Sequence, residues 1–174
     1  MEDLVRLVIS DERIFNIKNN NLDLTNDEAH YINNVMRIKT GKEIFITNGK
    51  GSLWKAIKVK NDYLTISQLQ KPYLFQKQEI YLLGIAVVIP KSGFEDILKM
   101  CTEIGIDFIQ PLFSERQVNK NLNFTRKLLR WNSIIKEAVE QSERLWKPSI
   151  LNGMDIIEWL KIRDNQERVS ISIT

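Results

Sequence analysis

The pattern of apolar and polar residues is most informative in the central stretch 79–117, where it predicts a strand, a helix and a second strand. Ile80–Ile89 is apolar at almost every position, which is typical of a strand buried on both faces. Four apolar residues follow with helical spacing: Phe94, Ile97, Leu98 and Cys101. Ile106–Phe113 is apolar again, apart from Asp107 and Gln110. A helix between two buried strands predicts a right-handed crossover and a parallel sheet covered by helices.

The predicted helix of this stretch carries signals at both of its ends. Pro90 closes the first strand, and Ser92 is suited to cap the helix because its hydroxyl can accept a backbone N–H bond. Gly105 stands where many helices end in the left-handed conformation. Cys101 falls on the apolar face, so we expect its thiol in the core rather than acting as a nucleophile.

The N-terminal part of the chain predicts a compact and mostly β module. Val5–Ile9 has the composition of a short strand. Thr25 and Glu28 have capping-box spacing, and the helix that they start is expected to end near Gly41. Three further strands are expected: Glu43–Thr47, Leu53–Val59 and Tyr63–Leu69. The segment Asn48-Gly49-Lys50-Gly51 predicts a tight hairpin turn between the first two of these.

A polar segment at 71–78 indicates a linker, so we place a domain boundary near residue 75, with domains 1–75 and 76–174. In the second domain, Lys127–Trp146 predicts a long helix. Its core-facing residues are Leu128, Trp131, Ile135, Ala138 and Leu145. Three shorter elements are expected after it: a strand at Ser149–Leu151, an amphipathic helix at Met154–Ile162 and a strand at Val169–Ile173. The predicted fold class is therefore α/β, preceded by a small β-barrel.

Composition narrows the class of protein. The 174 residues suit one large domain or two small ones, and 43% hydrophobic with 27% charged residues argues against disorder. No apolar run approaches the length of a membrane span, and the first ten residues are acidic where a signal peptide would be basic. A single cysteine excludes an internal disulfide and fits the cytoplasm. With one histidine and one cysteine, we expect no structural metal site.

Positive charge is concentrated in the N-terminal part. Between Arg37 and Lys60 the chain carries seven Lys or Arg residues against Glu43 alone. A phosphate backbone is a natural partner of such a stripe, while a solvated lysine face on a small β domain explains it equally well. His30, the single histidine, lies two helical turns before Arg37, so a partly buried structural imidazole and an RNA contact both stay open.

Two polar clusters are candidates for chemistry. Ser114-Glu115-Arg116 follows the second strand of the central stretch, and ligands of open α/β sheets bind beyond the carboxyl ends of strands. An ordinary solvated loop is the alternative. The second cluster, Glu140–Arg144, ends the long helix; a salt-bridged helix surface explains Glu140 and Arg144 but accounts less well for Gln141 and Ser142. If both clusters serve one site, they should converge at one edge of the sheet.

Four segments occurring in series carry a family resemblance: His30–Ile44, Pro90–Asp107, Pro111–Val118 and Arg130–Pro148. In these segments the chain resembles the bacterial ribosomal RNA uridine-N3 methyltransferases of the SPOUT superfamily. The resemblance implies a PUA-like RNA-binding barrel followed by a SPOUT-type (α/β knot) methyltransferase domain. It also implies transfer of a methyl group from S-adenosylmethionine to N3 of a uridine in small-subunit ribosomal RNA, by a cytoplasmic homodimer.

Under this resemblance, roles are expected for residues of both clusters and of the basic stripe. The expected catalytic residues are Arg116, Glu140 and Arg144, and the expected RNA-binding residues are His30, Arg37, Lys50, Lys55, Lys58, Ser114, Glu115, Gln141 and Ser142. Removing the weakly acidic N3 proton needs a base, and the anion that develops needs cationic or hydrogen-bonding partners, which these residue types supply.

The sequence departs from the family at Met100, where a lysine is usual, and at its end. The family's glycine-rich knot loop has no counterpart up to Thr174, so the methyltransferase domain is expected to be incomplete and residues that bind the donor are expected beyond Thr174. We therefore expect this chain not to bind S-adenosylmethionine measurably. Two alternatives remain: a non-catalytic RNA-binding module with a dimerising α/β domain, and an α/β enzyme acting on a small molecule, which the basic stripe disfavours.

Overall fold

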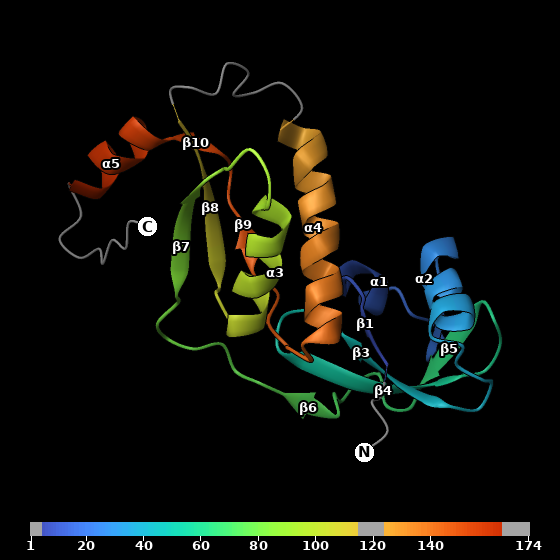
Figure 1. Ribbon diagram of the computed structural model, residues 1–174. Helices are drawn as coiled ribbons and strands as arrows, with labels where there is room; N and C mark the ends of the chain where they lie inside the picture. The colour runs from blue at the N-terminus through green and yellow to red at the C-terminus, as the bar shows by residue number, and fades with distance from the viewer. Residues whose placement is uncertain (1–4, 115–123, 165–174) are drawn as a thin grey trace. The chain divides into compact units, whose positions relative to one another are not determined.

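The computed structural model describes residues 5–114 and 124–164. The chain divides into two compact units, of which unit 1 comprises Met1–Ile80 with Lys136–Lys147 and unit 2 comprises Tyr81–Ile135 with Pro148–Thr174. Helix α4 (Phe124–Gln141) contributes its first part to unit 2 and its last turns to unit 1. Each unit has a sheet of its own (Figure 1).

Unit 1 is built on a six-stranded sheet with the path β1-β3-β4-β5-β2, and β6 pairs with β4. Its strands are β1 (Arg6–Val8), β2 (Asn21–Asp23), β3 (Glu43–Thr47), β4 (Ser52–Lys58), β5 (Tyr63–Ile66) and β6 (Leu74–Phe75). Only β1 and β3 pair in parallel; the other pairs are antiparallel. The predicted strands and the hairpin turn after Thr47 are confirmed, whereas β2 and β6, of three and two residues, are too short to show a strand pattern.

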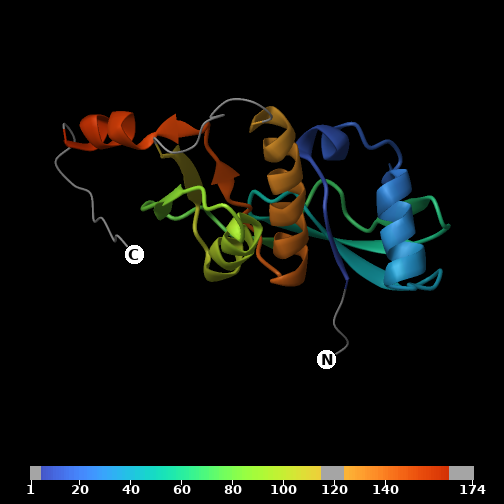
Figure 2. The same cartoon turned by 45° about the horizontal axis from the view of Figure 1, so that its top comes forward.

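The core of unit 1 follows from the two-residue alternation of its strands. Buried side chains of one face form a single cluster that includes Leu7, Ile44, Ile46, Trp54, Ala56, Leu64 and Ile66. Helix α2 (Asn26–His30) lies against this sheet beside β5 (Figures 1 and 2), and Ile32 just after it is fully buried in the same cluster. The opposite face of the sheet, which we call the outer face, carries Arg6, Phe45, Leu53 and Lys55.

The helix that starts at Thr25 differs in length from the prediction. The capping box is confirmed, because the Thr25 hydroxyl accepts from the Glu28 N–H and the Glu28 carboxylate accepts from the Thr25 N–H. After α2 the chain continues as a π-helical turn, η1 (Tyr31–Val35), rather than as α-helix to Gly41. Arg37 then adopts a left-handed backbone with φ 53°, which ends the helical run.

Unit 2 contains the predicted strand–helix–strand crossover. Its elements are β7 (Gly84–Val88), α3 (Phe94–Ile104), β8 (Phe108–Phe113), the first part of α4, β9 (Ser149–Ile150), β10 (Met154–Asp155) and α5 (Ile156–Asp164). The strands run in the order β10-β8-β7, with β9 on β8, and every pair is parallel, which confirms the predicted sheet. Phe94 and Phe124 both contact Trp131, with ring centroids at 4.6 and 5.7 Å, so α3 and α4 pack through aromatic rings.

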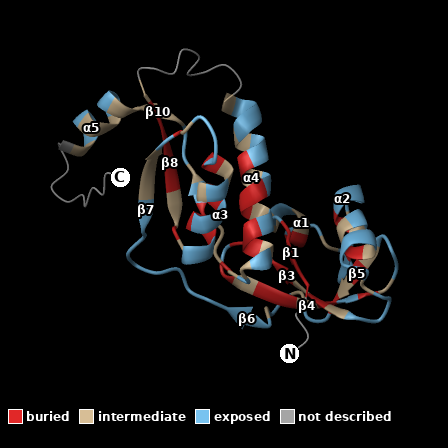
Figure 3. Cartoon of the chain, in the orientation of Figure 1, coloured by how far each residue is buried: buried red, intermediate tan, exposed pale blue. Residues whose placement is uncertain are grey.

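Several details of unit 2 correct the sequence analysis. The strand expected at Ile80–Ile89 is confined to Gly84–Val88 and is not buried on both faces, because it lies at the edge of the described sheet; Figure 3 shows β7 largely half-buried beside a buried β8. Ser92 does not cap α3; the N-cap is Gly93, with φ 83° and no side-chain bond. Gly105 ends α3 with φ 92°, as expected, and Cys101 is buried.

The long helix also differs from the prediction, because α4 ends at Gln141 rather than at Trp146. Glu143 has φ 58°, a left-handed conformation that no helix continues through. The predicted strand at Ser149 is confirmed as β9, whereas the predicted helix at Met154 begins only after the short strand β10. The strand expected at Val169–Ile173 lies outside the described residues.

Candidate functional site

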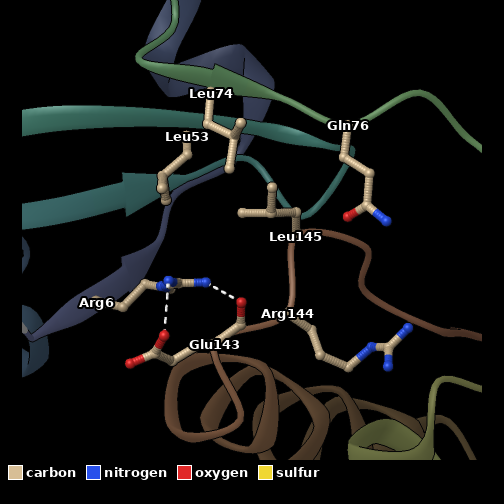
Figure 4. Close-up of a pocket in the computed structure, with 7 residues that line it drawn as sticks. All are labelled: Arg6, Leu53, Leu74, Gln76, Glu143, Arg144 and Leu145. Carbon is tan, nitrogen blue, oxygen red and sulfur yellow. Dashed lines mark hydrogen bonds and ion pairs between the residues drawn. The ribbon is translucent and has the colours of Figure 1, made fainter. Parts of the chain in front are cut away.

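Unit 1 contains a cavity of about 400 Å³ on the outer face of its sheet, shown in Figure 4. It is lined by Arg6, Leu53, Leu74, Gln76, Glu143, Arg144 and Leu145. Three leucines form an apolar wall, and the remaining lining residues are a carboxylate, an amide and two guanidinium groups. The cavity thus combines an apolar wall with two cations, an anion and an amide.

Arg6 supplies a fixed cation to this cavity. Its side chain projects from β1 onto the outer face, where the guanidinium donates to the backbone carbonyl of Glu143 and lies 3.6 Å from the Glu143 carboxylate. The Arg6 Nε is buried without a hydrogen-bond partner among the described residues. Burial lowers the pKa of Arg6 and the Glu143 charge raises it, yet a guanidinium stays protonated in proteins. The charge is therefore permanent and held in one orientation.

Arg144 reaches the cavity because of how the chain leaves α4. The left-handed Glu143 turns the backbone, and the segment after it bonds to the turn between β3 and β4. The Gly51 N–H donates to the Leu145 carbonyl at 2.9 Å, and the Lys147 N–H donates to the Gly49 carbonyl at 2.9 Å. The hairpin turn that the sequence predicted thus also holds the segment that carries Arg144.

Glu140 lies outside this cavity and is tied to strand β1. Its carboxylate accepts the Val8 N–H at 2.8 Å, and the Lys136 ammonium is 4.0 Å away. Burial raises the pKa of Glu140, because the charged form is poorly solvated there. Ser142, the neighbour of the exposed Gln141, donates its hydroxyl to the Ala138 carbonyl at 2.6 Å in the last turn of the helix. These contacts fit a role in positioning the end of α4.

A second buried carboxylate, Glu28, is fully engaged by cations. Arg13 donates to both of its oxygens, at 2.6 and 2.9 Å, and Lys136 lies 3.6 Å away. Burial opposes ionisation of Glu28, but the hydrogen bonds from Arg13 and from the Thr25 backbone outweigh it and hold the pKa below its usual value. This network stabilises the fold of unit 1.

The lysines expected to contact RNA have different environments. Lys58 is 3% exposed, and its ammonium donates to the Asn33 side chain and, at 2.6 Å, to the Ile38 carbonyl. It cannot meet a phosphate in this structure, so we remove Lys58 from the RNA-binding set. Lys50 is exposed and pairs with Asp11 at 2.6 Å, whereas Lys55 pairs with Glu43 at 3.3 Å.

The remaining expected residues are divided between exposed positions and the other unit. His30 and Arg37 are exposed near the end of the α2–η1 helical run. Ser114 is half-buried after β8 in unit 2, and Glu115 and Arg116 lie outside the described residues. Gln141 and Arg144 belong to unit 1, so the expected convergence of the two polar clusters stays a prediction.

Sequence reasoning missed Arg6 and Gln76, which line the cavity beside Arg144. The alternation within Val5–Ile9 indicates that Arg6 faces away from the core, but it does not identify the residues that Arg6 contacts. Gln76 is placed by a backbone bond from its N–H to the Gly51 carbonyl at 2.8 Å, which no sequence pattern announces. Within the ranges that the structure describes, no group of His, Cys, Asp and Glu residues suits a metal ion, and no helix is long and apolar enough to cross a membrane.

Comparisons with known proteins relate both parts of the chain to RNA methyltransferases. Residues 77–173 match the model of the RNA methyltransferase domain, and residues 24–57 match that of the RNA methyltransferase PUA domain. Ribosomal RNA small subunit methyltransferase E of Synechocystis is 36% identical over 147 residues, covering 83% of this chain and 46% of that protein. The protein of the same name from Buchnera aphidicola (subsp. Schizaphis graminum) is 27% identical, covering 87% of this chain and 63% of its own length.

Solved structures give the same result for the fold. A methyltransferase of Legionella pneumophila, in complex with bound S-adenosylmethionine, superposes with a TM-score of 0.77 at 20% identity, covering 97% of this chain and 69% of that one. Ribosomal RNA small subunit methyltransferase E of Neisseria gonorrhoeae, bound to S-adenosylmethionine, gives a TM-score of 0.68 at 21% identity, covering 90% and 64%. Fold and family model agree: a PUA-like unit precedes a SPOUT-type methyltransferase domain.

The chain therefore belongs to the RNA methyltransferase family. The relatives to which it is similar carry the name ribosomal RNA small subunit methyltransferase E. The chain spans about half to two thirds of the length of these relatives, at 46% and 63%.

Proposed function

We propose that the chain serves S-adenosylmethionine-dependent methylation of N3 of a uridine in small-subunit ribosomal RNA. The observation that carries the proposal is the match of residues 77–173 to the RNA methyltransferase domain. The match of residues 24–57 to a PUA domain supports a division near residue 75, with RNA binding before it and methyl transfer after it. The basic surface and the two-arginine cavity of unit 1 support RNA as the substrate.

The chemistry assigns different tasks to the two parts. S-adenosylmethionine, when bound, supplies an electrophilic methyl group. In the middle of β8, the Gln110 amide is committed to the carbonyls of Pro111 and Asn152, at 3.0 and 2.6 Å. Ser114, which follows the carboxyl end of β8, is the last residue described in this segment. These residues alone do not make a donor site, so no step is derived through the donor.

For the RNA, the described residues support binding and orientation. The N3 proton of the uracil must leave, and the negative charge that develops on its oxygens is stabilised by fixed cations. We propose that Arg144 holds the substrate through a phosphate or a uracil oxygen, and that Arg116, which follows β8 in the sequence, serves the same purpose. We propose Glu140 and Ser142 as positioning residues for Arg144, because both are engaged with the backbone.

The test is methyl transfer to small-subunit ribosomal RNA with labelled S-adenosylmethionine, followed by mass spectrometry of the nucleosides. The proposal requires that S-adenosylmethionine binds, contrary to the expectation from the sequence. We expect N3-methyluridine with wild-type protein and a loss of about 100-fold or more in Arg144→Ala, the scale of losing one electrostatic partner of a transition state. RNA binding without any methylation would favour the alternative of a non-catalytic RNA-binding module. A homodimer is part of the proposal and is checked by sedimentation.

A further inference from the structure

We propose that Tyr73, supported by Phe45 and Lys55 on the outer face of the unit 1 sheet, is a stacking site for an unpaired base of the RNA substrate. The inference rests on the proposed function and names where unit 1 contacts an unpaired nucleotide. None of the matched protein names and descriptions assigns this role to any residue.

The first observation is exposed apolar surface around β6. Tyr73, Leu74 and Phe75 are 61%, 50% and 62% exposed, and they follow one another in the chain. Scattered exposed apolar residues are ordinary, but a contiguous group on an edge strand marks a surface that binds something.

The second observation is the arrangement of rings and charge. The rings of Tyr73 and Phe45 are stacked, with centroids 5.7 Å apart and planes 29° apart. The Lys55 ammonium lies 4.6 Å from the centre of the Tyr73 ring and 6.0 Å from that of Phe45. Phe45 supports Tyr73, and the 61% exposure of Tyr73 leaves ring surface open to solvent. An exposed aromatic ring accompanied by a cation is an arrangement that single-stranded RNA sites use.

The strand register explains why these residues meet. Phe45 and Lys55 are direct partners in the β3–β4 pair, so both side chains stand on the outer face. Leu53 pairs with Leu74 in the β4–β6 pair, which brings the preceding Tyr73 alongside. Tyr73 itself precedes β6, and its contacts with Phe45 and Lys55 show that its ring lies on the outer face.

Charge favours RNA over a protein partner. The segment around Tyr73 carries Lys71 and Lys77 and no acidic residue between them, and Lys55 adds a third cation. Glu43 is the counter-charge, 3.3 Å from the Lys55 ammonium, and a phosphate would compete with it for that lysine. A nucleotide combines a planar π face with a negative charge, and so complements both the ring and the lysines.

The neighbouring cavity extends the same surface. Leu53 and Leu74, which place Tyr73, also form the wall opposite Arg6 and Arg144. The Arg6 guanidinium lies 5.9 Å from the centre of the Phe45 ring, so Phe45 lies between the cavity and Tyr73. The proposed stacking site therefore adjoins the cavity through Phe45 and Leu74.

The test compares variants of the whole chain by fluorescence anisotropy with a labelled single-stranded RNA. Tyr73→Ala is expected to weaken binding by roughly 5- to 100-fold, the range seen when a base-stacking ring is removed, while Tyr73→Phe retains affinity. Phe75→Ala is the matched control, since it removes a ring of similar exposure two residues further along the chain and should change affinity little. Lys55→Gln should lower the salt slope by about 0.7, whereas Tyr73→Ala should leave it unchanged.

Failure of the inference can be told from failure of the proposed function. If wild-type protein binds no RNA at any salt concentration, the proposed function fails. If it binds with a salt slope and Tyr73→Ala binds equally well, or Phe75→Ala loses as much, the stacking site is overturned while the proposed function stands. If Tyr73→Ala instead lowers the sedimentation mass, the surface joins two copies of the chain and the proposal is overturned. Circular dichroism of each variant verifies that it is folded.

Discussion

Lys55 and Lys58 stand three positions apart on β4, so the pleat sends their side chains to opposite faces of the sheet. The Lys55 side chain lies on the outer face over Tyr73, whereas the Lys58 ammonium is buried against the Asn33 side chain and the Ile38 carbonyl. Charge counted along the sequence treats both lysines alike. Burial separates a residue that can meet a phosphate from one that holds the loop after η1 in place.

This difference gives a stability prediction. Lys58→Met preserves the side-chain length but leaves two acceptors without their donor, so we expect a loss of about 1–3 kcal/mol in the free energy of unfolding. Lys55→Met removes only a partly exposed pair with Glu43 and should cost less than about 1 kcal/mol. Urea denaturation followed by circular dichroism measures both. Equal losses would show that the burial of Lys58 is not what matters.

The two buried glutamates of unit 1 predict opposite pH effects. The pKa of Glu28 is lowered in the fold, so its ionised form stabilises the protein above its usual pKa, and this stability is lost as the pH falls through the folded-state pKa. The pKa of Glu140 is raised, so the folded protein binds this proton more tightly than the unfolded chain does. Stability therefore falls as the pH rises from the usual pKa of a glutamate through the raised pKa of the folded state.

We therefore expect Glu28→Gln to be less stable than wild type at pH 7 by about 1 kcal/mol, with the difference closing below about pH 4. Glu140→Gln keeps an oxygen for the Val8 N–H and should be at least as stable as wild type at pH 7, converging with it at acid pH. Thermal unfolding across this pH range tests both. A Glu140→Gln variant that is markedly less stable at pH 7 would contradict the assignment.

At the scale of elements, the turn between β3 and β4 has a demanding geometry. Gly51 has φ 91°, and a Cβ added there would lie 2.2 Å from the Gln76 carbonyl oxygen and 2.9 Å from the Trp146 ring. Gly41 has a similar φ of 86° but nothing within 4 Å of an added Cβ. Comparing alanine substitutions at the two positions therefore distinguishes the cost of backbone strain from the cost of a steric clash.

We expect Gly41→Ala to lower the free energy of unfolding by about 1–2 kcal/mol, the cost of a left-handed backbone for a residue with a side chain. Gly51→Ala adds the clash with backbone and should cost more, besides shifting β6 and the segment that carries Arg144. Chemical denaturation gives the two values. A Gly51→Ala variant no less stable than Gly41→Ala would show that β6 moves freely.

Helices and strands with a clear hydrophobic period could be predicted from the sequence. Helix ends that depend on the backbone conformation of a single residue could not. The spacing around Leu98 and the alternation within Glu43–Thr47 identified α3 and β3, because burial of one face dictates such patterns. The ends near Arg37 and Glu143 depend on left-handed conformations of residues that seldom adopt them, so sequence reasoning made both helices too long. Local sequence carries little information on either end.

In the candidate site, likewise, residues marked by a local sequence signal could be predicted, whereas residues brought together by strand pairing could not. Arg144 was singled out because its polar cluster ends an amphipathic helix, which is a local signal. Arg6 and Gln76 come to the same cavity only through the pairing of β1 with β3 and of β6 with β4. Tyr73 was part of a predicted linker, and its stacking on Phe45 likewise depends on the β4–β6 register. Contacts between distant strands require the fold.

At the scale of the whole molecule, cations are unevenly distributed between the two parts. Residues 1–78 carry 12 Lys or Arg against 9 Asp or Glu, and residues 79–174 carry 13 against 13. RNA affinity should therefore come from the N-terminal part, where Arg37 and Lys39 are exposed at the end of the helical run. Residues 79–174 carry no net charge, which leaves little net attraction for a polyanion.

The final prediction compares two double variants that remove equal charge from exposed positions. Arg37→Gln with Lys39→Gln should weaken RNA binding on all sequences alike and flatten the salt slope by about 1.4, because two cations no longer displace counterions. Lys91→Gln with Lys99→Gln, on unit 2, should leave the slope nearly unchanged. Affinities measured at several salt concentrations with one RNA give both slopes. Equal flattening by the two double variants would mean that the RNA spreads its phosphates over both units, and the basic stripe would then lose its special role.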